Sequence, residues 1–406
     1  MLYLGVLVLN RIKEYFSDIF FRGDSYIVLE ILNHYIQATV LKINAENKKI
    51  RVIRNWISPI NNFNVPEVLD GIKPLLKKIH HLEKYKVILS LDSSFAATIY
   101  ASVPLVRQHP REVIDEVDMD NLISQAIWRF FDRNRFKVAQ KIGVDEVDIL
   151  LSDIRIRGIK IDGHKIVNPM GFKAKSVEIF FSQTLVGRQL MKGIRDLIPK
   201  ENIIFITETG TAMSHILSKA LKKDNFFLAN LFPDNSVIFA ASGGRLSHHD
   251  NFGWGENNIR NSLSDHFAVD SDTANEIMMK YAGSGVSQGF SRRFENILGR
   301  ELQTFANGME SLIDKDSADI YLNPFFTAPP LLFADRFRDR MQKSLKLMPL
   351  STNIITENFG YEVQFNELVK VKNIFTVLSA FLEIGLLPQN DKMSHLANRR
   401  VRWLIT

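Results

Sequence analysis

The chain has 406 residues, 46% of them hydrophobic and 24% charged, which is the composition of a folded protein with two or more packed units and excludes a disordered one. It has no cysteine, which excludes disulfide scaffolds, thiolate zinc sites and cysteine nucleophiles. The formal net charge of +6 is spread over 51 basic and 45 acidic residues. We interpret this excess as solvated surface and expect no nucleic-acid partner.

The chain begins with nine mostly apolar residues, and charges begin at Arg11. A membrane span needs roughly 20 apolar residues, and a signal peptide has a leading basic region, so we do not expect export. Residues 1–24 can be wound as a helix with one apolar side. They are interpreted as an N-terminal amphipathic extension packed on the body.

The next segments alternate between strand and helix patterns. Three β-rich runs in meander order are predicted within residues 25–57, a helix over 65–79, strands within 86–105 and a helix over 118–143. Residues 184–221 read as helix, buried strand and helix, and residues 226–282 as hairpins and a helix pair. A long amphipathic helix is predicted over 292–314, and a further helix over 371–387. The whole pattern is that of an α/β protein.

Residues 155–182 carry the most specific pattern. A strand reaches the hairpin turn Asp162-Gly163, and a second strand is broken at Asn168-Pro169-Met170-Gly171. This order resembles the end of the inserted subdomain of the bacterial cell-division protein FtsA, and the resemblance extends over residues 25–345. It implies an actin-like fold of duplicated ribonuclease H-like α/β domains with an inserted strand-helix-strand-strand subdomain.

The resemblance also implies domain boundaries. Actin-like domain 1 would comprise residues 25–85 and 183–210, and the insert residues 86–182. Actin-like domain 2, with its outer subdomain, would comprise residues 211–390, and a basic amphipathic tail would follow over 391–406.

The family's nucleotide motifs are eroded here. Actin-like ATPases hold phosphates on glycine-rich hairpins, because backbone N–H groups close around an anion only where side chains are absent. The segments aligned with the family's three nucleotide elements contain bulky residues instead of glycine: Glu30-Ile31-Leu32-Asn33, Asn230-Leu231-Phe232-Pro233-Asp234-Asn235 and Asn323-Pro324-Phe325-Phe326. We therefore predict a pseudo-ATPase with no catalytic residues and no bound cofactor.

The alternative is that ATP and Mg²⁺ still bind, with four polar residues as contacts: Glu30, Asn33, Asn230 and Asn235. No other metal site is expected. His248 and His249 are adjacent on a predicted strand, so their side chains point to opposite faces and do not readily share one ion.

Residues 393–406 can be wound as a short helix with an apolar and a basic side. Apolar and aromatic residues enter the headgroup region of a membrane while arginines bind anionic lipid. The predicted membrane-binding residues are Leu396, Arg399, Arg400, Val401, Arg402, Trp403 and Leu404. A C-terminal helix docked on the body remains the alternative.

The resemblance implies a non-catalytic or weakly catalytic scaffold that links FtsZ-like division filaments to the membrane. We expect a cytoplasmic protein, peripheral on the inner face of the cell membrane and capable of self-assembly. One alternative is a PilM-like protein of type IV pilus assembly, which binds a peptide of a membrane partner. Another is an actin-like ATPase with an unusual nucleotide pocket.

Overall fold

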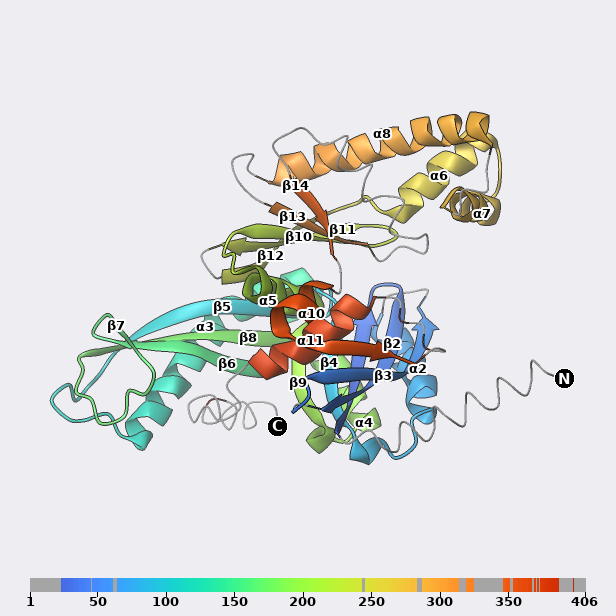
Figure 1. The fold of residues 1–406 in the computed structure, drawn as a ribbon. Helices are drawn as coiled ribbons and strands as arrows, with labels where there is room; N and C mark the ends of the chain where they lie inside the picture. Colours follow the sequence, from blue (N-terminus) through green and yellow to red (C-terminus); the bar gives the residue numbers. More distant parts are fainter. Residues whose placement is uncertain are drawn as a thin grey trace. The chain divides into compact units, whose positions relative to one another are not determined.

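The computed structural model describes residues 23–44, 46–60, 64–242, 245–282, 287–313, 319–324, 346–350, 353–366, 369, 371, 373–386 and 397. The chain forms two compact units, one from residues 1–216 and 355–406 and the other from residues 217–354 (Figure 1). Nearly all of the N-terminal extension predicted over residues 1–24 lies outside the described residues.

The first unit is built on a six-stranded sheet. Strands β1 (Asp24–Leu32), β2 (Tyr35–Asn44) and β3 (Lys49–Pro59) form an antiparallel meander. Strands β4 (Lys86–Leu91) and β9 (Ile203–Glu208) continue the sheet parallel to β1, and β15 (Glu362–Phe365) is added beside β3. The strand order is β15-β3-β2-β1-β4-β9.

Helices cover this sheet. Alternate residues of β1, among them Ile27, Leu29 and Ile31, join one core cluster with buried residues of α2 (Val65–Lys77) and α4 (Arg188–Leu197). Tyr26, which precedes Ile27 in β1, contacts Phe381 of α11 (Ile374–Leu386), and the centroids of the two rings are 5.1 Å apart. The unit also contains α10 (Asn353–Phe359), the first part of α5 (Thr209–Leu221) and three 3₁₀ helices, η1 (Leu82–Lys84), η2 (Glu146–Asp148) and η3 (Lys200–Asn202).

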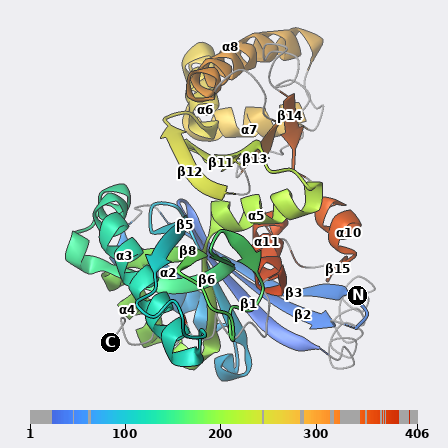
Figure 2. The same cartoon turned by 90° about the vertical axis from the view of Figure 1, so that its left-hand side faces the viewer.

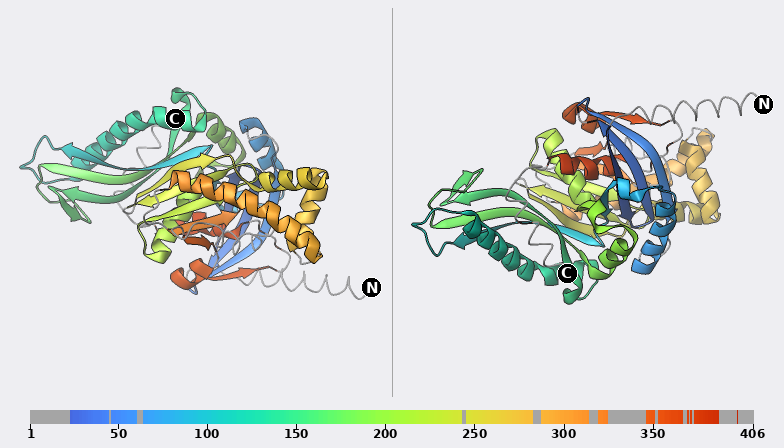
Figure 3. Two further views of the ribbon diagram at one scale, coloured as in Figure 1. Left: turned by 90° about the horizontal axis from the view of Figure 1, so that it is seen from above. Right: turned by 90° about the horizontal axis from the view of Figure 1, so that it is seen from below.

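An inserted subdomain lies between β4 and α4. Its elements are β5 (Ala96–Val106), α3 (Glu116–Ile142), β6 (Ile149–Ile161), β7 (His164–Ile166) and β8 (Ser176–Gly187). They form an antiparallel sheet in the order β5-β8-β6-β7, with α3 along one face (Figure 3). The hairpin turn has the predicted geometry, because Asp162 and Gly163 both have positive φ angles, of 47° and 86°.

The second unit has a five-stranded sheet and its own core. Strands β10 (Phe226–Leu231), β11 (Ser236–Ser242), β12 (Arg245–Phe252), β13 (Asp319–Pro324) and β14 (Lys346–Pro349) lie in the order β12-β11-β10-β13-β14. Helices α6 (Glu256–Phe267), α7 (Ser271–Ala282) and α8 (Gln288–Leu312) belong to the same unit as this sheet (Figure 2). The core between them contains the large aromatic residues Trp254, Phe294 and Phe305.

Both sheets share one topology. In each, three successive strands pair antiparallel, and the first of the three pairs in parallel with a later strand that is followed by another parallel strand. This is the duplicated ribonuclease H-like arrangement of the actin-like fold. The predicted fold class is confirmed, and the inserted subdomain has the predicted strand, helix, strand and strand with the short additional strand β7.

Two predicted boundaries differ from the observed ones. The insert was expected to begin at residue 86, but β4 pairs with β1, so the four-stranded sheet begins only at Ala96 and continues to Gly187. Residues 355–386 were expected in domain 2, but they group with the first unit, because β15 pairs with β3 and α11 packs on β1 and β4. Both differences arise from strand pairing between segments distant in sequence.

Candidate functional site

The first hairpin, β1–β2, carries the acid that the sequence suggests as a nucleotide contact. Glu30 is fully buried, and its Oε2 accepts a hydrogen bond from Gln37 Nε2 at 2.9 Å. Burial raises the pKa of the Glu30 carboxyl to about 8, because hydrogen bonds with Thr376 and Gln37 offset only part of the effect. The carboxyl is therefore mostly protonated at neutral pH, whereas Mg²⁺ prefers ionised carboxylates.

The turn of this hairpin is enclosed by its neighbours. Leu32 is fully buried, and Asn33 is half-buried at the turn itself. The carbonyl of Ile31 accepts a hydrogen bond from Asp92 N at 2.8 Å, and the carbonyl of His34 accepts one from Ile60 N at 3.1 Å. Leu32 therefore occupies a closed position beside the turn.

The second hairpin, β10–β11, is closed by different contacts. Phe232 is buried, and its N–H donates to the carbonyl of Asn235 at 2.8 Å. The carbonyl of Pro233 accepts a hydrogen bond from Asn257 N at 2.8 Å, at the start of α6. A Cβ on Gly255 would lie 2.1 Å from the Phe232 carbonyl oxygen, so only glycine allows this close approach. The loop before α6 thus rests directly on the hairpin.

The two asparagines of this hairpin have different surroundings. Asn230 is buried, and its Oδ1 accepts a hydrogen bond from Asn323 Nδ2 at 3.0 Å, which joins β10 to β13. Asn235 is half-buried, and its Oδ1 has no hydrogen-bond partner among the described residues. The structure brings Glu30 and Asn33 to one hairpin and Asn230 and Asn235 to another.

The third segment that the sequence analysis aligned with a nucleotide element, residues 323–326, is described only in part. Asn323 is buried and Pro324 ends β13, while Phe325 and Phe326 lie outside the described residues. The side-chain hydrogen bond from Asn323 to Asn230 therefore links this segment to the second hairpin.

Glu208, which the sequence interpretation missed, connects the insert to the main sheet. It ends β9 and is fully buried. Its Oε2 accepts hydrogen bonds from Thr98 N at 2.8 Å and Thr211 Oγ1 at 2.9 Å, and its Oε1 accepts one from Lys141 Nζ at 3.1 Å. These partners come from β5, α5 and α3. One carboxylate therefore joins four elements, and such charge-assisted bonds are among the stronger ones in proteins.

A second buried carboxylate, Glu383 of α11, forms a similar junction. It accepts a hydrogen bond from Thr207 Oγ1 at 2.8 Å and lies 3.5 Å from His215 Nδ1 and 3.7 Å from Arg157. Burial by itself would raise the pKa of Glu383, but the neighbouring His215, Arg157 and Thr207 hold it below the usual value. The sequence carries a signal for this site, because Glu383 is the one charged residue in the apolar helix 374–386.

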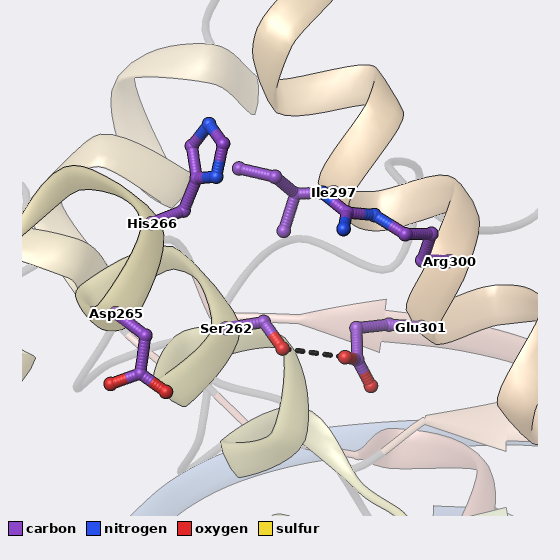
Figure 4. A pocket seen from close by; sticks show the side chains of 6 residues that line it. All are labelled: Ser262, Asp265, His266, Ile297, Arg300 and Glu301. Atoms are coloured by element: carbon purple, nitrogen blue, oxygen red, sulfur yellow. Dashed lines mark hydrogen bonds between the residues drawn. The ribbon is translucent and has the colours of Figure 1, made fainter.

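The second unit contains a pocket of about 310 Å³ between α6 and α8 (Figure 4). Its polar lining combines Asp265, His266, Arg300 and Glu301, so acidic and basic groups are balanced. Ser262 Oγ donates a hydrogen bond to Glu301 Oε1 at 2.5 Å, so one oxygen of the Glu301 carboxylate is already engaged. The lining could accept a small polar molecule but does not select a chemical class.

The predicted membrane-binding residues, from Leu396 to Leu404, lie outside the described residues. Their neighbour Ala397 is described: it is helical and fully buried in the core cluster of the insert. In the described part of the chain, no helix has the length and apolar character that crossing a bilayer requires. The described residues also contain no group of three or more His, Asp or Glu side chains placed to hold a metal ion.

No protein-family model matches this sequence, and no curated protein matches it. Similar solved structures exist. The PilM-PilN type IV pilus biogenesis complex is 10% identical over 90% of this chain and 100% of that chain, with a TM-score of 0.47. MreB5 of Spiroplasma citri bound to ADP is 9% identical over 93% and 98%, with a TM-score of 0.38. The ethanolamine utilization protein EutJ from Carboxydothermus hydrogenoformans is 9% identical over 80% and 85%, with a TM-score of 0.38.

The strand order of the two sheets by itself gives this chain the actin-like fold, with an inserted subdomain.

Proposed function

We propose that this protein is an actin-like scaffold with little or no ATPase activity, which links a filament protein to the inner face of the cell membrane. The observation that carries this proposal is the state of the two hairpins. Glu30 is buried with a pKa of about 8, and Phe232 and Pro233 occupy a turn that rests on the loop before α6. A phosphate needs open backbone N–H groups, and Mg²⁺ needs anionic oxygens. Both hairpins fit a structural role better.

Calorimetric titration of the purified chain with ATP and Mg²⁺ tests this proposal. We expect no measurable heat of binding at neutral pH. Micromolar affinity would overturn the pseudo-ATPase and favour an ATPase with an unusual pocket. If ATP bound, the change Asn235→Ala would then identify whether the half-buried amide contacts the nucleotide, because Asn235 Oδ1 has no described hydrogen-bond partner.

The proposed filament partner is an FtsZ-like protein, and the alternative partner is a peptide of a membrane protein in type IV pilus assembly. Both partners suit an actin-like body with an inserted subdomain. Co-sedimentation with preformed FtsZ filaments separates the two. Saturable binding to the filaments supports the division role, and its absence together with binding of a pilus-protein peptide supports the PilM-like role.

The membrane link is proposed to be the tail, through Trp403, Leu404 and the neighbouring arginines. Ala397, the one described residue of this tail, is buried in the core of the insert. Deletion of residues 398–406 keeps Ala397 in place, and we expect it to weaken sedimentation with anionic vesicles without lowering the thermal midpoint. A large loss of stability with unchanged vesicle binding would make the tail part of the folded core.

A further inference from the structure

Helix α3 of the insert exposes two large aromatic side chains. Its inner face, including Ile123, Ile127 and Phe130, is buried against the insert sheet. On the outer face, Trp128 is 52% exposed and Phe136 is 57% exposed. They are eight residues apart, which is about two helical turns and places them on the same side of the helix.

Two cations lie beside the rings on this face. Arg129 and Arg133 are exposed, and neither makes an ion pair with another described residue. Lys137 is also exposed, but it is nine residues after Trp128 and so lies half a turn around the helix. Asp132 is the acid among them, and its Oδ1 lies 3.9 Å from Arg135, which also binds Glu146. The outer face between residues 128 and 136 therefore carries an excess of unpaired positive charge.

We propose that this outer face, formed by Trp128, Arg129, Arg133 and Phe136, binds an anionic lipid membrane. Aromatic rings partition into the headgroup region, and arginine side chains bind the anionic lipid phosphates. The two unpaired cations supply the charge complementarity with such a surface.

The spacing argues for lipid over a protein partner. The centre of a protein interface is depleted in charge and is formed by contiguous apolar side chains. On α3, charged residues separate the two rings, which favours a fluid surface that accepts rings and charges side by side. A helix held on the body by its inner face can also enter a membrane only to a shallow depth, as interfacial helices do.

The inference deepens the proposed membrane role by naming a second lipid contact, but its observations come from α3 alone. The predicted tail is compatible with it. Ala397 is buried in the core that α3 covers, and the seven residues to Leu404 reach at most about 25 Å.

The test uses the full chain and sedimentation with vesicles of phosphatidylglycerol and phosphatidylcholine in a 3:7 ratio. The double change Arg129→Glu and Arg133→Glu should weaken binding at least tenfold. The matched control Lys165→Glu and Lys173→Glu makes the same change in net charge at exposed positions of the same subdomain. It should weaken binding by much less. All these side chains are exposed, so the thermal midpoints should agree with that of the unchanged protein.

Quenching of tryptophan fluorescence by brominated lipids gives an independent measurement. Quenching should remain in Trp403→Phe and should be lost when Trp128→Phe is added to that variant, if α3 enters the headgroup region. Equal losses of binding in the α3 variant and its charge-matched control, or quenching that persists when both Trp128 and Trp403 are replaced, would overturn the proposal. If the α3 variant binds vesicles normally while deletion of residues 398–406 abolishes binding, the tail remains the anchor and only the α3 surface is wrong.

Discussion

The hairpins β1–β2 and β10–β11 occupy equivalent places in the two sheets, but different groups fill the space beside their turns. In the first, the side chain is the determining feature, because burial raises the pKa of the Glu30 carboxyl to about 8. In the second, the backbone is the determining feature: the carbonyls of Phe232 and Pro233 receive N–H groups from the start of α6. Equivalent topology therefore does not impose equivalent chemistry.

The surroundings of the two hairpins differ in the same sense. The first unit contains buried carboxylates, Glu208 and Glu383, which join elements from the main sheet, the insert and the C-terminal helix. The core of the second unit is held largely by aromatic packing around Trp254, with Phe305 at 4.7 Å between ring centroids. This comparison predicts that the stability of the first unit depends on charge and pH. The stability of the second unit should depend mainly on side-chain volume and packing.

The largest effect is expected for Glu383→Ala in the first unit. Removing one member of a buried ionic cluster costs about 3–5 kcal/mol, because His215 and Arg157 are left without their carboxylate. The pKa of Glu383 is lowered by folding, so its contribution is present above the pKa of the unfolded chain and is lost as pH falls through the folded value. Urea unfolding at pH 7 and pH 3.5 measures both predictions.

The matched control is Glu362→Ala, which removes an exposed ion pair with Lys49. It should leave the unfolding midpoint unchanged. A loss for Glu383→Ala no larger than that of the control would mean that the cluster does not hold the first unit together.

An intermediate effect of opposite sign is expected for Glu30→Gln. The folded pKa of Glu30 is raised, so stability is full below the unfolded pKa and falls as pH rises through about 8. A tenfold change in a protonation equilibrium corresponds to about 1.4 kcal/mol, and we expect the amide to stabilise the protein by roughly 3 kcal/mol at pH 8.5. At pH 4 the two proteins should be nearly equal.

Thermal unfolding of both proteins between pH 4 and pH 9 measures this difference. The hydrogen bond from Gln37 is available to the amide oxygen of the variant as well, so packing is conserved. If Glu30→Gln were destabilising at every pH, Glu30 would be an ionised ligand and the nucleotide alternative would gain support.

The smallest effect is expected for Gly255→Ala in the second unit. The new Cβ would lie 2.1 Å from the Phe232 carbonyl oxygen, so the loop must move away from the hairpin, at a cost of about 1–3 kcal/mol. The control Gly253→Ala is two residues away and meets no atom within 4 Å. Hydrogen exchange at the Asn257 amide, which donates to Pro233, should accelerate in the first variant only.

Identical exchange in the two glycine variants would show that the loop before α6 does not hold the second hairpin. In that case the backbone of the hairpin would be open, and the difference between the two hairpins would be smaller than their contacts indicate.

The sequence by itself determined most of the order of elements, because periodic apolar residues placed the helices and strands. The fold class and the insert came from the resemblance to the FtsA family, which the Asp162-Gly163 turn and the Asn168-Pro169-Met170-Gly171 corner carry. The turn itself is local, because only a few residue types adopt positive φ angles readily. The bulky residues Leu32 and Phe232 at hairpin positions were also visible in the sequence. These features are local, and local sequence encodes them.

Only the tertiary structure decided which segments share a sheet and which polar groups meet. The pairing of β4 with β1, and of β15 with β3, joins residues far apart in the chain, so the predicted domain boundaries were displaced. The sequence names Glu30 as a possible nucleotide contact, and only the fold shows that the residue is buried, which raises its pKa. Burial and ion pairing depend on contacts between distant segments, and no periodicity in a single chain records them.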